Sequence, residues 1–356
     1  MHIFDAHLDL ALNGVDWNRD LRLSVDEIRA QETRLAMADE AGRTTNTVSF
    51  PELKKAEVKT CLATLLAREE PQINHSFGWI SEHTCYAMAH AHLAYYRAMQ
   101  RAGELNLLKT KQDLAAHRTR IDSDSDSSLG FILTMEGADP LLTIDAIEEF
   151  YEHGLRAIGL THYGDNRYGG GTNSRLGLHA DAKPLLQKIE NLGMTLDLTH
   201  LSDAAFPQAL DWFGGRVHAS HQNSRRLASW QRQFSDEQYK EVLQRDGVIG
   251  IAFDIIMLQE GYVRRQSPLE ATIATAADNI DIVCQLAGNA NQVGIGSDLD
   301  GGYGADQTPA DLDRISDLQV LPNLLSDRGY SDEEIRGIMH ENWFRFFESV
   351  LPDAPI

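Results

Sequence analysis

The stretch FDAHLDL at residues 4–10 ends a short β-prone run close to the start of the chain. Alternate side chains of an extended segment point to the same face, so His7 and Asp9 lie on one side of the strand. If the chain stays extended here, this imidazole and this carboxylate are placed to bind one metal ion, and a hydrogen-bonded structural histidine is the alternative. The other strands of the chain decide between these two interpretations.

Short apolar runs alternate with longer segments of helical pattern along the whole chain. Eight of the runs are strand candidates, and most of them are almost continuously apolar, as strands buried on both faces are. They cover residues 2–7, 58–65, 129–135, 155–161, 194–199, 216–220, 248–253 and 292–297. Repeated strand–helix units without a Pro-, Gly- or Ser-rich linker predict a single (β/α)8 TIM barrel domain over residues 1–356.

Several helix boundaries can be predicted between these strands. Capping boxes predict helices that begin after Ser24, Ser235 and Ser331. Ser267 followed by Pro268 predicts a further start, because proline is tolerated at the first helical position. The segment 81–118 is expected to form one or two helices.

Composition and charge narrow the classes of partner. The 356 residues are 42 % hydrophobic and carry a formal net charge of −21, which is typical of an acidic globular enzyme. Nucleic acids and anionic membranes attract basic surfaces, so neither is an expected partner. The sequence shows no signal-peptide pattern and no apolar run of membrane-spanning length. Three isolated cysteines, Cys61, Cys85 and Cys284, lie in apolar contexts and indicate buried thiols in a reducing cytoplasm.

Six of the eight predicted strands end in side chains that bind metals or protons. In a barrel of this class the active site lies at the carboxyl ends of the strands, so these groups converge on one rim. Each one alone has a structural alternative, such as capping the next helix, but a polar cluster of this size is costly to bury without compensation. The candidate residues are His7, Asp9, Glu136, His162, His200, His221 and Asp298.

The types of ligand indicate the class of metal. Several imidazoles with carboxylates and no thiolate favour zinc and, less specifically, manganese, iron or cobalt. The candidates are too many for one four-coordinate ion, so two ions that share a carboxylate fit better. Such a pair holds a bridging water as hydroxide near neutral pH and polarises a substrate carbonyl. A remaining acid is then available to move a proton to a leaving amine.

An ordered series of motifs resembles the membrane dipeptidase, or renal dipeptidase, family of the amidohydrolase superfamily (peptidase family M19). The series runs through nearly the whole chain, and its order makes it specific. Its members are DAHLDL at 5–10, MEGADPL at 135–141, GLTHYGDN at 159–166, DLTHLS at 197–202, SHQNSRRLAS at 220–229, GVIGI at 247–251, GIGSDLDG at 294–301 and ENWFRFF at 341–347.

The resemblance implies a (β/α)8 barrel with two Zn²⁺ ions that hydrolyses dipeptides. It implies that His7 and Asp9 bind the first ion and that Glu136 and a hydroxide bridge both ions. The same resemblance assigns His200 and His221 to the second ion. A homodimer is also implied only in this way.

The resemblance further implies three residues that act on the substrate. Asp298 would contact the catalytic water and move its proton, and His162 would orient the substrate and stabilise the oxyanion. Arg232 would bind the C-terminal carboxylate of the dipeptide, a role that a guanidinium fork suits. Arg225 and Arg226 lie nearby, and the sequence around Arg232 departs from the usual local pattern.

Two alternatives to a dipeptidase remain open at this point. One is another binuclear amidohydrolase, such as an N-acyl-amino-acid deacylase or a cyclic-amide hydrolase. The other is a metal-binding scaffold without activity, which the intact ligand set disfavours. Specificity is expected to depend on the loops at 66–80, 163–178 and 255–266, and the glycine run at 169–171 predicts a flexible turn, with a substrate cradle or a lid as alternatives.

Overall fold

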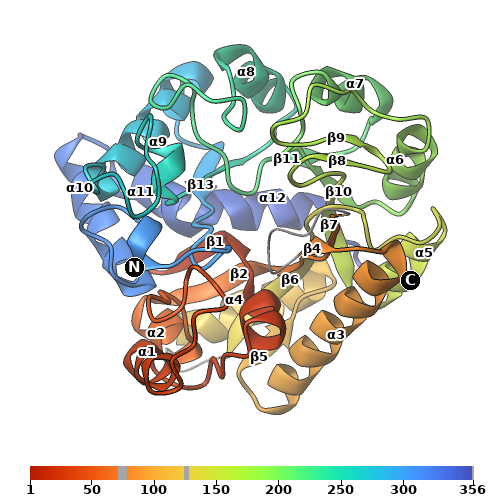
Figure 1. The fold of residues 1–356 in the computed structure, drawn as a ribbon. Coiled ribbons are helices and arrows are strands. Elements are labelled where there is room, and N and C mark those ends of the chain that lie inside the picture. The colour runs from red at the N-terminus through yellow and green to blue at the C-terminus, as the bar shows by residue number, and fades with distance from the viewer. Residues whose placement is uncertain (71–77, 124–127, 355–356) are drawn as a thin grey trace.

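Eight parallel strands form a barrel at the centre of the molecule, and helices surround them (Figure 1). The computed structural model describes residues 1–70, 78–123 and 128–354. The barrel strands are β1 (Ile3–Leu8), β2 (Val58–Leu65), β6 (Leu129–Met135), β7 (Leu155–Gly159), β10 (Thr195–Asp197), β11 (Val217–His218), β12 (Ile249–Ile251) and β13 (Val293–Ile295). Each strand lies within its predicted run or extends one residue beyond it, so the predicted TIM barrel is confirmed.

The sheet closes through contacts between residues that are far apart in the chain. The hydrogen-bonded order is β11-β10-β7-β6-β2-β1-β13-β12, so the first barrel strand pairs with the last, with Asp5 opposite Ile295. A parallel bridge between Ala219 and Ile249 joins the two ends of this order. At this junction a Cβ on Gly250 would lie 1.9 Å from the Ser220 carbonyl oxygen, so only glycine permits the close approach.

The helices alternate with the barrel strands around the ring. They are α1 (Val25–Arg34), α2 (Phe50–Lys55), α3 (Glu82–Arg101), α4 (Lys111–Ser123), α5 (Ala146–Glu152), α6 (Ala182–Asn191), α7 (Ala205–Trp212), α8 (Asp236–Gln244), α9 (Ile273–Ala287), α10 (Leu321–Asp327), α11 (Asp332–Arg336) and α12 (Asn342–Val350). The three predicted capping boxes are present at the starts of α1, α8 and α11.

The helix start predicted at Ser267 is wrong. Helix α9 begins at Ile273, after Thr272 as its N-cap. The side chain of Gln259 holds the preceding segment out of helical conformation, because its Oε1 accepts hydrogen bonds from the backbone amides of Glu270 and Ala271. The Asp311 carboxylate then caps the amide of Ile273 at 2.8 Å. Tertiary contacts therefore override the local start signal.

The predicted helical segment 81–118 contains a strand that was not predicted. The segment 81–118 forms α3 and most of α4, with β5 (Leu105–Leu107) between them. Strand β5 pairs in parallel with the amino-terminal half of β6. Its three residues are too few to show a period of two, so the pattern could not indicate it.

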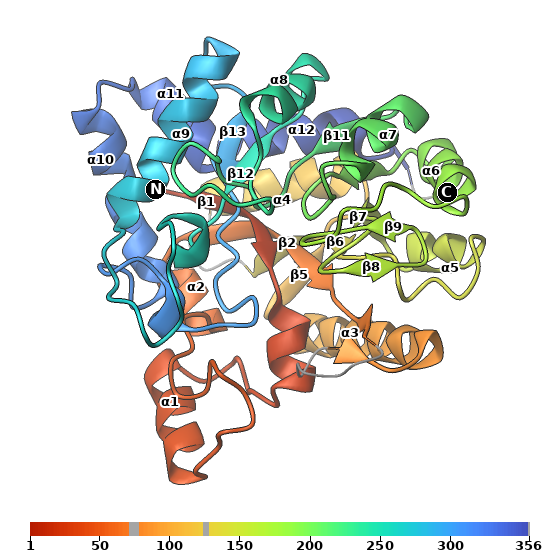
Figure 2. The ribbon, with the colours of Figure 1, turned by 45° about the horizontal axis from the view of Figure 1, so that its top comes forward.

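Helices α4 and α12 close the end of the barrel where the strands begin. Both lie near the centre of the ring in Figure 1, and Figure 2 shows α12 behind the strands as well. One buried cluster joins Phe4, Leu62 and Ile132 from the strands to aromatic rings of α12, including Trp343 and Phe347. The Trp343 indole donates a hydrogen bond to the Ile295 carbonyl at 3.0 Å. This end of the barrel is therefore filled with apolar side chains.

Two of the three cysteines are buried as the sequence predicts, and the third is not. Cys61 and Cys85 are buried and Cys284 is half-buried, all as free thiols. Burial raises the pKa of Cys85 to about 12, which keeps this thiol protonated. Of the helices that the structure describes, none has both the length and the apolar character that a bilayer crossing requires.

Candidate active site

The predicted strand-end residues meet at the opposite end of the barrel, around the carboxylate of Glu136. Glu136 follows β6, and its side chain is 8 % exposed. Its Oε2 lies 3.4 Å from His7 Nε2, while its Oε1 lies 3.1 Å from His200 Nε2 and 3.5 Å from His221 Nε2. The two oxygens of this carboxylate therefore face different imidazoles. Oε2 faces His7, and Oε1 faces His200 and His221.

The first group contains His7 and Asp9, as the opening stretch of the sequence predicts. His7 Nε2 lies 3.6 Å from Asp9 Oδ2 and 3.8 Å from Asp298 Oδ1. The Thr64 hydroxyl donates a hydrogen bond to the other oxygen of Asp9 and so fixes the rotation of this carboxylate. Asp9 therefore presents one defined oxygen beside His7.

The second group contains His200 and His221, whose Nε2 atoms are 3.1 Å apart. The far ring nitrogens of both residues are held by hydroxyls. Thr172 Oγ1 lies 2.9 Å from His200 Nδ1, and Ser220 Oγ lies 2.9 Å from His221 Nδ1. Such outer contacts fix the ring orientation and leave Nε2 free as a donor atom.

The electrostatics of the cluster fit bound cations. Burial lowers the pKa values of His200 and His221 well below that of an ordinary histidine, with Arg232 adding to the effect on both, so both rings are neutral at pH 7 with a lone pair available. Among the described residues, the buried atoms His7 Nε2 and Glu136 Oε2 have no hydrogen-bond partner. Unpartnered buried donor and acceptor atoms are costly, and metal ions are the partners that imidazole and carboxylate groups share. The residues present therefore fit bound divalent metal around Glu136.

His162 and Asp298 lie beside these two groups. His162 Nε2 is 3.7 Å from Glu136 Oε1, and burial lowers the pKa of His162 well below its ordinary value. Burial raises the pKa of Asp298 well above that of an ordinary aspartate. The backbone of Asp298 is left-handed, with φ of 60°, as is that of His200, with φ of 69°. Such conformations are rare for residues other than glycine and are concentrated at functional sites.

Arg232 lines the same cavity as the metal-binding candidates, whereas Arg225 and Arg226 do not. The Arg232 side chain is buried and donates hydrogen bonds to Gln222 Oε1 at 2.6 Å and to the His221 carbonyl at 3.1 Å. Both acceptors are neutral, and the structure shows no carboxylate within 4.0 Å of this guanidinium in the part of the chain that it describes. Arg232 therefore offers a buried positive charge to an anion in the cavity.

Asp254 is a polar residue of the cavity that was missed at the sequence level. It lies three residues after the end of β12 and directly after the predicted run 248–253, and Gln307 Nε2 donates hydrogen bonds to both of its oxygens at 2.9 and 3.0 Å. Burial raises the pKa of Asp254 to about 7. The strand-end rule that identified the other candidates also applies to this position. The hydroxyls of Thr64 and Thr172 were missed because no sequence spacing links them to Asp9 and His200, and that of Ser220 was missed although Ser220 directly precedes His221.

The glycine run at 169–171 is not a flexible turn. These glycines are buried, and a Cβ on Gly171 would lie 2.0 Å from the His162 carbonyl oxygen. The same carbonyl accepts a hydrogen bond from the Thr172 amide at 2.8 Å. Glycine is therefore needed for the loop to pass close to His162 and to place Thr172 against His200.

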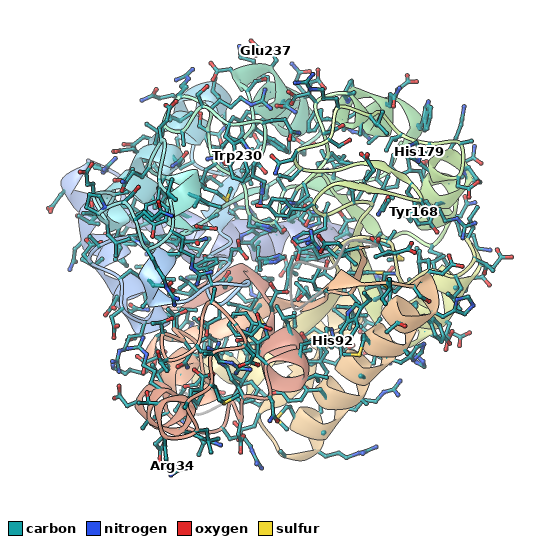
Figure 3. All side chains as sticks on the ribbon, viewed as in Figure 1. Arg34, His92, Tyr168, His179, Trp230 and Glu237 are labelled. Atoms are coloured by element: carbon teal, nitrogen blue, oxygen red, sulfur yellow. The ribbon has the colours of Figure 1, made fainter. Side chains whose placement is uncertain are left out.

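The cavity has a volume of about 1090 Å³, and residues of all three predicted specificity loops line it. Arg68, Tyr163 and Arg264 each line the cavity from one of these loops. Residues 71–77 of the first loop lie outside the described residues. Trp230 lies beside Tyr163, with a ring separation of 6.5 Å. In Figure 3 Trp230 lies toward the middle of the molecule, whereas Arg34 and Glu237 lie at the edge of the molecule.

Comparisons with known proteins identify the family of this chain. The family model described as membrane dipeptidase (peptidase family M19) matches residues 1–352. Dipeptidase tcpJ of Claviceps purpurea is 25 % identical over 263 residues, which cover 69 % of this chain and 59 % of that protein. Three other curated relatives are matched over about half of their own length, 47 %, 49 % and 54 %.

Solved structures show the same fold at low sequence identity. The dipeptidase AC, a metallopeptidase of family M19, has a TM-score of 0.80 at 21 % identity, with 99 % of both chains covered. A metallopeptidase from Rhodobacter sphaeroides, liganded with a phosphinate mimic of the dipeptide L-Ala-D-Ala, has a TM-score of 0.79 at 20 % identity. This match covers 98 % of the present chain and 99 % of the other.

Proposed function

Because the chain belongs to the membrane dipeptidase family, peptidase family M19, we propose that it hydrolyses dipeptides with two zinc ions bound at the barrel rim. In this proposal His7, Asp9 and Glu136 hold one ion, and Glu136, His200 and His221 hold the other. When bound, two such ions supply a hydroxide nucleophile near neutral pH and polarise the scissile carbonyl. The two-sided placement of Glu136 between the histidines supports this arrangement.

The observation that carries the choice of substrate is Arg232. This buried guanidinium faces a cavity that also contains the metal-binding candidates, and its described partners are neutral. A dipeptide has a free carboxylate one residue beyond its scissile bond, so binding of that carboxylate by Arg232 places the bond within the cluster. Hydrogen bonds between a guanidinium and a carboxylate are among the stronger ones in proteins.

His162 and Asp298 complete the proposed reaction. The neutral His162 ring donates a hydrogen bond to the oxyanion that develops on the scissile carbonyl. Asp298 accepts the proton released by the attacking water and transfers it to the amine nitrogen as the C–N bond breaks. The high pKa that burial gives Asp298 suits a carboxyl group that carries a proton between two steps.

Purified, zinc-loaded protein assayed with L-Ala-L-Ala, L-Ala-D-Ala and N-acetyl-L-alanine tests this function. We expect hydrolysis of at least one of the dipeptides, and a preference for N-acetyl-L-alanine would instead support a deacylase. Absence of hydrolysis with fewer than two ions per chain would support a scaffold. The stereochemistry at the second residue, the cytoplasmic location and the homodimer stay predictions.

Arg232→Met tests the assignment of the substrate carboxylate. We expect its KM for dipeptides to rise by about 10- to 100-fold, because hydrogen bonds to charged groups contribute about 1.5–3 kcal/mol. Arg226→Met is the matched control, since Arg226 is paired with Asp236 away from the cavity. An unchanged KM in Arg232→Met would remove the reason to prefer a dipeptide.

A further inference from the structure

A second group of potential metal ligands lies on the outside of the barrel, where α3 meets α5. His90 belongs to α3, Glu149 belongs to α5, and His153 is the C-cap residue of α5. Figures 1 and 2 both show the two helices as neighbours in the ring. None of the three residues lines the cavity of the candidate active site. The group is therefore separate from the proposed catalytic centre.

Glu149 lies between the two imidazoles. Its Oε1 is 3.4 Å from His90 Nε2 and 4.0 Å from His153 Nε2, and the three donor atoms all lie within 4.8 Å of one another. Glu149 and His153 are four residues apart, so they share one face at the end of α5. A four-coordinate zinc needs donor atoms about 3.3 Å apart, so side-chain shifts of roughly 1 Å bring the three into position.

Neighbouring aromatic side chains hold two of the three ligands in place. The hydroxyl of Tyr86 donates hydrogen bonds to Glu149, at 3.1 Å from Oε2 and 3.3 Å from Oε1. The ring of His90 packs against Tyr86 and Phe150, with centroid separations of 4.4 and 5.2 Å. An outer hydrogen bond to a ligating carboxylate and a fixed imidazole are features of metal sites in proteins.

The nearest polar partner of His90 Nε2 among the described residues is Glu149 Oε1, at the long distance of 3.4 Å. The atom is buried and makes no hydrogen bond within the part of the chain that the structure describes. An unpaired buried ring nitrogen is destabilising, and it points toward Glu149. Arg97 is a positively charged residue near His153.

We propose that His90, Glu149 and His153 bind a divalent transition-metal ion, zinc in the first place, that links α3 to α5. Two imidazoles and a carboxylate form one of the ligand sets of zinc sites with an open fourth position. Imidazole ligands favour zinc, copper or nickel over calcium and magnesium, which prefer oxygen ligands. Arg97 opposes the ion by its charge, whereas Glu149 compensates part of the charge of the ion directly.

Equilibrium dialysis at buffered free zinc tests this site. Wild-type protein is expected to bind one zinc ion more per chain than the double variant His90→Ala/His153→Ala. His83→Ala is the matched control, because His83 is an exposed histidine of the same helix, and it should keep the wild-type stoichiometry. Hydrolysis of dipeptides should be unchanged in all of these variants, so loss of the outer ion is distinguishable from loss of the catalytic ions.

Glu149→Gln provides a second test that preserves the packing. Glutamine keeps the size of the side chain and an acceptor for Tyr86 but removes the charge, and we expect zinc binding at this site to weaken at least tenfold. Equal zinc stoichiometry in the wild type and the double variant would overturn the proposal. So would unchanged zinc affinity in Glu149→Gln, even if the double variant did not fold.

Discussion

At the carboxyl ends of its strands the barrel interior is lined by imidazoles and carboxylates, whereas at the amino ends it is filled by phenylalanine and tryptophan rings. His7 and Phe4 are three residues apart in one strand, yet His7 faces Glu136 and Phe4 packs against Phe344 and Phe347. The first end brings several charged and imidazole groups together around Glu136, whereas the second is built mainly from apolar and aromatic side chains. We propose chemistry for the first end and describe only packing at the second, so substitutions at the two ends should have separable effects on turnover and on stability.

The largest expected effect is on turnover at the polar end. Asp298→Asn should lower kcat by about 10⁴-fold, near the upper limit for loss of a proton-transferring group. Asparagine tolerates the left-handed backbone of this position, so the fold and the zinc content should be kept. Steady-state kinetics with zinc analysis measure both, and near-wild-type kcat would refute the role of Asp298.

Asp300→Asn is the control for Asp298→Asn. The Asp300 carboxylate accepts hydrogen bonds from the amides of Thr47 and Val48, so it holds a neighbouring loop and contacts no metal-binding candidate. We expect a loss of stability with kcat retained. Equal losses of kcat in both variants would show that the strand-end loop acts as one unit.

At the apolar end we expect substitutions to lower stability and to leave zinc binding unchanged. Trp343→Ala should lower the free energy of unfolding by about 3–5 kcal/mol, because it leaves a cavity among Phe4, Phe346 and Phe347. Denaturant unfolding measures this change, and the zinc stoichiometry of the folded variant should equal that of the wild type. Val350→Ala, at the edge of the same cluster, should cost much less. Loss of zinc in Trp343→Ala without loss of stability would contradict the division between the two ends.

Acid should destabilise the apolar end through His117. Burial lowers the pKa of His117 to about 4, while that of an unfolded histidine is 6.5. The unfolded chain therefore binds this proton first, and the stabilisation is complete above pH 6.5 and is lost as the pH falls toward 4. Between pH 7 and pH 4.5 the wild type should lose about 2–3 kcal/mol more than His117→Gln. An equal loss of unfolding free energy in the wild type and in His117→Gln between these two pH values would contradict this role of His117.

The smallest expected effect concerns the hydrogen bond that orients His200, one of the proposed metal ligands at the polar end. Thr172→Val removes the hydroxyl beside His200 Nδ1 without changing the shape of the side chain. We expect zinc affinity to fall by about 10- to 100-fold, as for other outer-shell contacts of metal ligands. Competition with a chelator measures this affinity. Thr161→Val is the control, because the hydroxyl of Thr161 has no hydrogen-bond partner among the described residues.

The barrel and the convergence of its strand-end side chains were predictable because both depend on local pattern. Apolar runs mark the buried strands, and a parallel barrel brings all their carboxyl ends to one rim, so His7 and Asp298 meet although 291 positions separate them in the chain. Asp254 obeys the same rule and was overlooked. Thr172 could not be predicted, because its contact with His200 depends on a loop folded by close glycine packing. The start of α9 also depends on distant partners, namely Gln259 and Asp311.

The pairing of β1 with β13 has a consequence for the synthesis of the protein. Asp5 accepts a hydrogen bond from the Ser297 amide at 2.8 Å, and His7 faces Asp298. Strand β1 therefore cannot form these contacts until β13 and the residues after it have been synthesised. At about 5–20 residues per second, the ribosome needs tens of seconds between making the two. A nascent chain released before β13 is made therefore lacks Asp298, the carboxylate proposed above to transfer the proton, and the last wall of the barrel. The proposed dipeptidase activity can arise only after the strand β13 and Asp298 have been synthesised.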